Sequence, residues 1–198
     1  MRLIIQIVLS IAIVVLGYFV YDSINSRITF EKVADKRKTV VVDRLKDIRA
    51  AQLAYKNEFG KYTDNFDTLL NYIYNGKVTV VKKVGDADDS IAVAEGRVFR
   101  DTILIAVKDT VFNASYLENR KSKFNVDSLP FVPYSGGVKF EMDTATVEKS
   151  RVKVPVFEVR SYYRDIYRGI DAKKHSVNLD EGLVVGSLTE TSTNGNWE

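Results

Sequence analysis

The chain has 198 residues, enough for one domain of ordinary size in addition to a membrane anchor, and 45% of them are hydrophobic. Its 29 basic and 26 acidic residues leave a net charge of +3, too small and too evenly spread to indicate a nucleic-acid partner. No cysteine is present, which excludes disulfides, thiolate nucleophiles and cysteine-based zinc sites.

An uncharged apolar run begins the chain and extends for nineteen residues, from Leu3 to Tyr21. A helix of this length spans about 28 Å, close to the ~30 Å hydrocarbon thickness of a bilayer. The run exceeds the apolar region of a usual signal peptide, and no A-x-A cleavage site follows it, so we predict an uncleaved anchor over residues 1–22 rather than a signal peptide. The residues that characterise this anchor are Leu3, Gln6, Ser10, Tyr18 and Tyr21.

The predicted helix continues beyond the membrane, because no proline occurs before Pro130 and Gly17 is the only glycine before Gly60. Its second half carries a mostly apolar stripe at helical spacing, which we expect to pack on the rest of the chain. The stripe consists of Val41, Leu45, Ile48, Gln52, Tyr55 and Phe59. The opposite face, which we expect to be solvated, carries Asp43, Lys46, Asp47, Lys56 and Asn57. A coiled coil has similar spacing, but Lys38 and Arg27 interrupt its seam.

Gly60 is expected to end this helix, since glycine suits the left-handed conformation just past a helix terminus. Thr63 or Asp64 is expected to cap a short second helix. The apolar positions of that second helix are Phe66, Leu69, Leu70 and Ile73.

This N-terminal pattern resembles the type IV pilin and pseudopilin family over about residues 1–75. The features that carry the resemblance are a tyrosine near the end of the helix, a glycine, aromatic residues and a short helix ending in leucines; here they are Tyr55, Phe59, Gly60, Tyr62, Phe66, Leu69 and Leu70. The resemblance implies a globular head packed on the outer half of a long helix and exposed to the periplasm or cell exterior. The family's leader, and the glutamate near the start of the apolar run that pairs with a neighbouring subunit in that family, are expected to be missing here; Gln6 is polar but uncharged. We therefore expect a pilin-like protein that stays in the membrane rather than a conventional pilus subunit.

Basic residues crowd the C-terminal flank of the anchor, and the positive-inside rule alone would place the following domain in the cytoplasm. They are Arg27, Lys32, Lys36, Arg37 and Lys38. Because the rule weakens for long translocated domains and the family resemblance implies export, we expect the head on the periplasmic or extracellular side of the inner membrane.

The remainder, residues 76–186, has the alternating patterns of an antiparallel sheet, and the predicted fold class is α+β. Asn75-Gly76 is expected to form a turn, followed by a strand over 77–84, an acidic turn over 85–90 and a second strand over 90–96. Further strands are expected from 98 to 112, with Ile103, Ile105 and Val107 on one face, and over 137–142, 144–150 and 151–163.

Three features complete this half of the chain. Pro155 predicts an edge strand or a bulge. Residues 114–137 indicate a long connecting loop, in which the segment LPFVPY (129–134) is expected to pack over the domain's own core rather than dock a partner. Residues 187–198 are expected to form a flexible tail, because this segment lacks core-forming residues apart from Leu188 and Trp197.

Sites for chemistry are sparse, and we predict neither an enzyme nor a bound cofactor or metal. The common nucleotide, serine-hydrolase and zincin motifs are missing from the sequence, and His175, the single histidine, is interpreted as a surface residue. The acidic group Asp86, Asp88 and Asp89 lacks the spacing of an EF-hand and is interpreted as a solvated hairpin tip.

A possible partner surface mixes tyrosines with arginines, side chains suited to a glycan, an anionic headgroup or an acidic partner, although a solvated face with half-buried rings explains the same pattern. It consists of Tyr162, Tyr163, Arg164, Tyr167 and Arg168. The predicted function is that of a membrane-anchored, pilin-like scaffold whose partners are membrane lipid and other envelope proteins, or a second copy of the chain, contacted through the anchor. The alternative is a membrane-tethered ligand-binding or sensory module, which predicts an aromatic-lined pocket in the strand-rich half.

Overall fold

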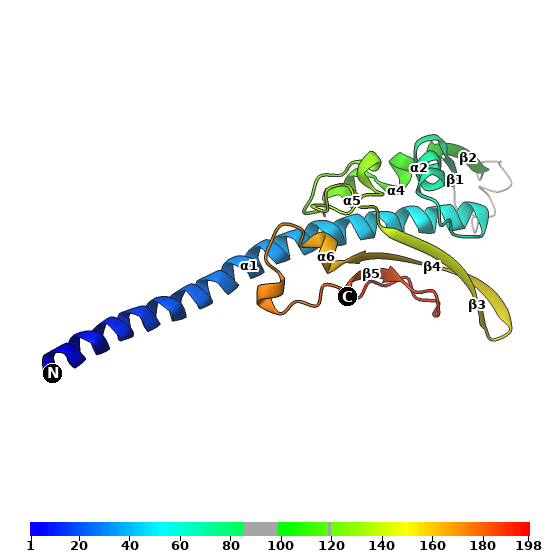
Figure 1. The fold of residues 1–198 in the computed structure, drawn as a ribbon. Helices are drawn as coiled ribbons and strands as arrows, with labels where there is room; N and C mark the ends of the chain where they lie inside the picture. Colours follow the sequence, from blue (N-terminus) through cyan, green and yellow to red (C-terminus); the bar gives the residue numbers. More distant parts are fainter. Residues whose placement is uncertain (85–98, 119) are drawn as a thin grey trace.

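A single long helix organises the molecule, and the fold is α+β as predicted. The computed structural model describes residues 1–84, 99–118 and 120–198. Helix α1 extends from Arg2 to Phe59 without a break. Its first half projects from the head as a bare rod, and its second half runs between two groups of elements that form the head (Figure 1).

The end of α1 follows the sequence prediction, whereas the start of the next helix does not. Gly60 adopts a left-handed conformation with φ 71°, and its N–H donates to the carbonyl of Lys56. Helix α2 spans Phe66–Asn75, and its N-cap is Asn65 rather than Thr63 or Asp64. The Asn65 side chain accepts from two backbone N–H groups of the first turn, at 2.7 and 3.2 Å, so it satisfies donors that would otherwise be orphaned.

One side of α1 is covered by α2, a two-stranded hairpin and two short helices (Figure 1). The hairpin strands are β1, Lys77–Val84, and β2, Phe99–Ala106, which pair antiparallel; the short helices are α4, Val107–Val111, and α5, Ala114–Glu118. The prediction that Val107 continues the strand was wrong, because its N–H bonds the Gly76 carbonyl and the chain turns there into α4. Gly76 itself is extended, with φ −70°, rather than part of a hairpin turn. The predicted acidic turn and the strand over 90–96 lie outside the described residues.

The segment expected to be a long loop contains α5 and the 3-10 turn η1, Val126–Ser128. Its apolar part packs on the domain's own core, as predicted: Leu129 is fully buried and Val132 is 3% exposed. This segment therefore closes the group of elements on its side of α1.

A three-stranded antiparallel sheet, ordered β3-β4-β5, covers the other side of α1. The strands are β3, Glu141–Lys149, β4, Val152–Tyr162, and β5, Gly182–Gly186. Ser150 and Arg151 form the two-residue turn between β3 and β4, both with positive φ, as in the turns that match strand twist. Pro155 lies opposite Thr146, in the part of β4 that β5 does not pair, so the proline occupies a locally unpaired edge without a bulge.

The C-terminal residues are held in place, contrary to the expectation of a flexible tail. After β4 the chain forms α6, Tyr163–Ile166, and the 3-10 turn η2, Lys173–His175, before it enters β5. Beyond β5, Gly186 donates its N–H to the Asn194 carbonyl, and the Asn196 side chain bonds the Gly182 carbonyl at 2.8 Å. These bonds fold the tail back along β5.

Candidate functional site

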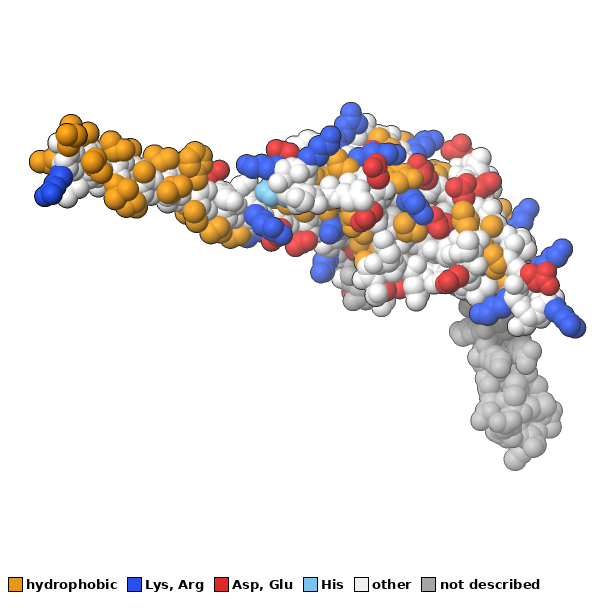
Figure 2. Space-filling model, turned by 60° about the horizontal axis from the view of Figure 1, so that its bottom comes forward, with side chains coloured by type: hydrophobic (Ala, Val, Ile, Leu, Met, Phe, Trp, Pro, Cys, Tyr) orange, Lys and Arg blue, Asp and Glu red, His pale blue; other side chains and the backbone are white. Residues whose placement is uncertain are grey.

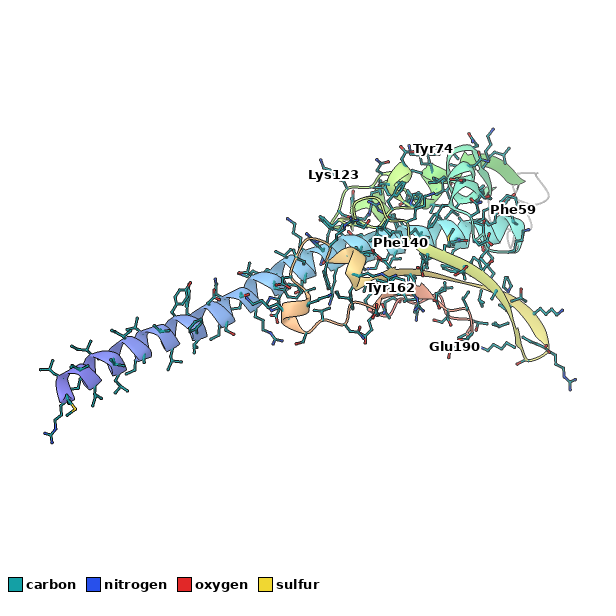
Figure 3. All side chains as sticks on the ribbon, viewed as in Figure 1. Phe59, Tyr74, Lys123, Phe140, Tyr162 and Glu190 are labelled. Atoms are coloured by element: carbon teal, nitrogen blue, oxygen red, sulfur yellow. The ribbon has the colours of Figure 1, made fainter. Side chains whose placement is uncertain are left out.

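The projecting half of α1 is the part of the molecule that the head leaves uncovered. Residues 1–25 are exposed, and no other element lies beside them among the described residues (Figure 3). Large apolar side chains surround this rod, as the orange surface of Figure 2 shows, with Leu3 70% and Tyr21 69% exposed. Of the helices described, α1 is long and apolar enough to cross a membrane.

Two polar side chains interrupt the apolar surface of the rod. Ser10 Oγ donates to the Gln6 carbonyl at 2.9 Å, so this hydroxyl is satisfied within the helix. The Gln6 side-chain amide has no hydrogen-bond partner among the described residues. In hydrocarbon such an amide favours contact with a polar group on another helix.

The second half of α1 buries most of the stripe that the sequence singles out. Val41, Leu45 and Ile48 are fully buried and Tyr55 is 8% exposed, whereas Phe59, at the helix end, is 52% exposed. The Phe59 ring nevertheless contacts the ring of Tyr55 at 4.4 Å and that of Tyr72 at 5.6 Å. The stripe therefore places α1 inside the core of the head.

Gln52, the polar member of the stripe, is also fully buried. Its amide donates to the Thr63 carbonyl at 2.6 Å and accepts from the Thr63 N–H at 3.2 Å. Both functions of the amide are satisfied, so Gln52 fixes the turn between α1 and α2 at little cost in buried polarity.

Polar side chains beside the stripe bind three further segments of the head. Arg37 donates to the carbonyls of Ile166 and Arg168, at 3.0 and 2.8 Å. Arg44 donates to the Ser128 carbonyl, and Arg49 donates to the Glu198 carboxylate at 2.8 Å. The sequence pattern did not predict these contacts, since a helical arginine beside a stripe gives no local signal of an acceptor that lies far along the chain.

A buried charged cluster lies where α5 and its following loop cross α1, and it corrects the expectation that Asp43 and Asp47 are solvated. Asp47 is fully buried and lies 2.8 Å from Arg120 Nη2; Tyr116 donates to its Oδ1 at 3.0 Å. Asp43 accepts from the Lys121 N–H at 3.0 Å and the Ser122 hydroxyl at 2.9 Å. The two carboxylates therefore hold this loop against α1.

Burial dominates the electrostatics of this cluster. Desolvation raises the pKa of Asp47 to about 6, against the opposing effects of Arg120, Tyr116 and Arg44. Desolvation and the adjacent Asp47 carboxylate also raise the pKa of Tyr116, which stays a neutral hydrogen-bond donor. Desolvation lowers the pKa of Arg44.

Two cavities open along α1 beside this cluster. The larger, about 460 Å³, lies between α1, the loop at Lys121, Tyr163 and the tail; the smaller, about 270 Å³, lies under α5. They share Asp43 and Lys46 on α1, so they lie next to each other along the helix, and we refer to the two together as the groove. Neither function expected from the sequence includes this groove, because its walls come from segments that are distant along the chain.

Two further cavities lie in the strand-rich half as far as the structure describes it, where a ligand-binding module predicts an aromatic-lined pocket. The cavity of about 370 Å³, at the tip of β3 and β4, is lined by Val147, Glu148, Lys149 and residues 189–192. A cavity bordered by Tyr62 and Phe157 measures about 170 Å³, below the roughly 300 Å³ typical of small-molecule sites. Neither of these two cavities combines aromatic walls with sufficient size.

The predicted partner surface is not one continuous face. Tyr167 is 4% exposed and belongs to the core, where its ring stacks on Tyr163 at 5.3 Å, and burial raises the pKa of both phenols. Arg168 donates to the Ser135 carbonyl at 2.6 Å. Arg164, 52% exposed in its side chain, lies over the Tyr162 ring at 4.2 Å. Arg164 and Arg168 are thus exposed, Tyr162 and Tyr163 are half-buried, and Tyr167 is buried.

His175 is half-buried rather than a free surface residue, because its ring stacks on Phe30 of α1 at 4.4 Å. No group of three acidic or histidine side chains within the described ranges is placed to hold a metal ion. Asp86, Asp88 and Asp89 lie outside those ranges. Comparison with protein-family models, curated proteins and solved structures finds no match to this chain. The pilin resemblance stays a prediction.

Proposed function

We propose that this protein is a single-pass, pilin-like scaffold of the cell envelope that acts through protein contacts. The observation that carries the proposal is the continuity of α1: one helix of 58 residues begins in an exposed apolar rod and ends as the core of the head. A rigid helix of this kind fixes the head relative to the membrane. A partner that contacts the anchor therefore also determines where the head is held.

The anchor favours helix–helix contact rather than lipid alone. Gln6, Ser10 and Gly17 lie on one face at helical spacing, and the Gln6 amide lacks a partner in the described chain. Small and polar residues of this kind let helices approach closely and bond one another in hydrocarbon. The proposed location is the inner membrane, with the head on the periplasmic or outer side.

Cysteine crosslinking tests the contact, and the absence of native cysteines makes each introduced thiol a single reporter. Gln6→Cys and Ser10→Cys are expected to give disulfide-linked oligomers in native membranes at native expression, because these positions face the partner helix. Non-reducing electrophoresis after mild oxidation measures the yield.

Ile4→Cys is the matched control, because it lies at the same depth on the opposite face of the helix. Its crosslinking yield is expected to be several-fold lower. Monomers alone at Gln6 and Ser10 would refute self-contact through this face, and crosslinks to other proteins would identify the partner as a different envelope protein.

Protease accessibility tests the side of the membrane. A periplasmic head is expected to resist added protease in intact cells and to be digested after osmotic shock, because only then does the protease reach it. Digestion in intact cells would place the head on the cell exterior. Protection after shock, with digestion only on lysis, would contradict an exported head.

A further inference from the structure

The groove along α1 is lined by cationic groups that lack acidic partners. Lys38, Lys46 and Lys121 border the larger cavity, and none of them forms an ion pair within the described residues. Lys38 lies over the Tyr163 ring at 5.3 Å. The groove therefore contains several cations free to meet a ligand.

The acidic groups of the groove are, by contrast, largely engaged. Asp43 accepts two hydrogen bonds from the loop, and Asp47 pairs with Tyr116 and Arg120. The remaining carboxylate of the lining is Asp35, an exposed residue of the larger cavity. Asp47 Oδ2 lies 2.8 Å from Arg120 Nη2 and has no hydrogen bond in the described structure, so its charge is balanced by an ion pair alone. The donors left to a ligand that enters the groove are the ammonium groups of Lys46 and Lys121.

Arg120 carries two further donors. Its side chain is 6% exposed and lines the smaller cavity, with Nη2 directed to Asp47 and Ser122. Nε and Nη1 are buried and have no hydrogen-bond partner in the described structure. A buried donor without a partner costs roughly 1–3 kcal/mol, more when charged. Both atoms are closed to solvent in this conformation, so an acceptor in the cavity bonds them only when the Arg120 side chain shifts.

We propose that the groove binds a small molecule that carries an oxyanion of the carboxylate or phosphate class. The oxyanion lies in the smaller cavity against Lys46 and Arg120. The remainder of the molecule extends along α1 into the larger cavity, beside Lys38 and Lys121. The larger cavity, at about 460 Å³, has the volume of a metabolite-sized site. This site is separate from the anchor contact of the proposed function, so a negative result for one proposal does not affect the other.

Titration calorimetry and thermal unfolding of the full chain in detergent test the site. The probes are inorganic phosphate and citrate, with sodium chloride at matched ionic strength. Saturable binding and a rise in Tm are expected with phosphate, citrate or both, and not with chloride. Binding of phosphate alone assigns the phosphate class, and binding of citrate alone assigns the carboxylate class.

Lys46→Gln and Lys121→Gln are expected to weaken the Kd at least about tenfold, since each removes a charge-assisted contact. Both positions are exposed, so the fold is retained, which circular dichroism checks. Lys153→Gln, an exposed lysine on β4 away from the groove, is the matched control and is expected to bind as the wild type does. The proposal is overturned if neither probe binds, if chloride has an equal effect, or if the two groove variants bind as tightly as the control.

Discussion

Replacing Ile48 with alanine is expected to lower the free energy of unfolding by about 2–5 kcal/mol. Ile48 is fully buried in the part of α1 that runs between the two groups of elements of the head. The truncation removes apolar contact and leaves a cavity that collapses poorly. Collapse is restricted because Arg44, Asp47 and Arg49, on either side of Ile48, each bind a different segment of the head.

Urea unfolding of the full chain in detergent, followed by the fluorescence of its single tryptophan, measures this loss. Trp197 is half-buried near α1, so its fluorescence is expected to change when the head unfolds from α1. Leu53→Ala is the matched control on the same helix, because Leu53 is 37% exposed; its cost is expected to be below about 1 kcal/mol. Equal costs for the two variants would contradict the placement of α1 as the core of the head.

Local patterns in the sequence predicted the elements that depend on interactions between residues near one another in the chain. The apolar stripe of α1 repeats at the helical period, and the structure buries Val41, Leu45 and Ile48 along it. Gly60 ends the helix because its left-handed conformation is open to glycine without strain. The alternation over 151–163 likewise predicted β4, since one face of that strand is buried.

Contacts between segments that are far apart along the chain determine the features that the sequence did not predict. Asp43 and Asp47 have the spacing of an exposed helix face, and only the return of the loop at Tyr116–Ser122 buries them. Thr63, Asp64 and Asn65 are adjacent, and each can cap a helix. Asn65 is the N-cap of α2, because its backbone has the extended conformation of an N-cap residue. The tail has few apolar residues, but its backbone bonds to the edge of β5. The groove combines all of these distant segments, so no local pattern predicts it.

The stability of the protein is expected to fall by about 2 kcal/mol between pH 4 and pH 7 through the titration of Asp47. Burial raises the pKa of this carboxyl from 3.8 to about 6. Between those values the folded chain binds a proton that the unfolded chain has lost. The contribution is therefore fully present below about pH 4, declines as the pH rises towards 6, and is absent above it.

Asp47→Asn isolates this effect, because the amide keeps the shape of the carboxyl and does not titrate. The groups that face Asp47 are Arg120, Tyr116, Arg44 and Asp43. Relative to the wild type, the variant is expected to gain about 2 kcal/mol from pH 4 to pH 7 in parallel urea titrations. Asp64→Asn, at an exposed position, controls for the loss of one negative charge. A constant difference between wild type and Asp47→Asn at every pH would mean that folding does not shift the pKa of this carboxyl, and would contradict the expected loss of stability.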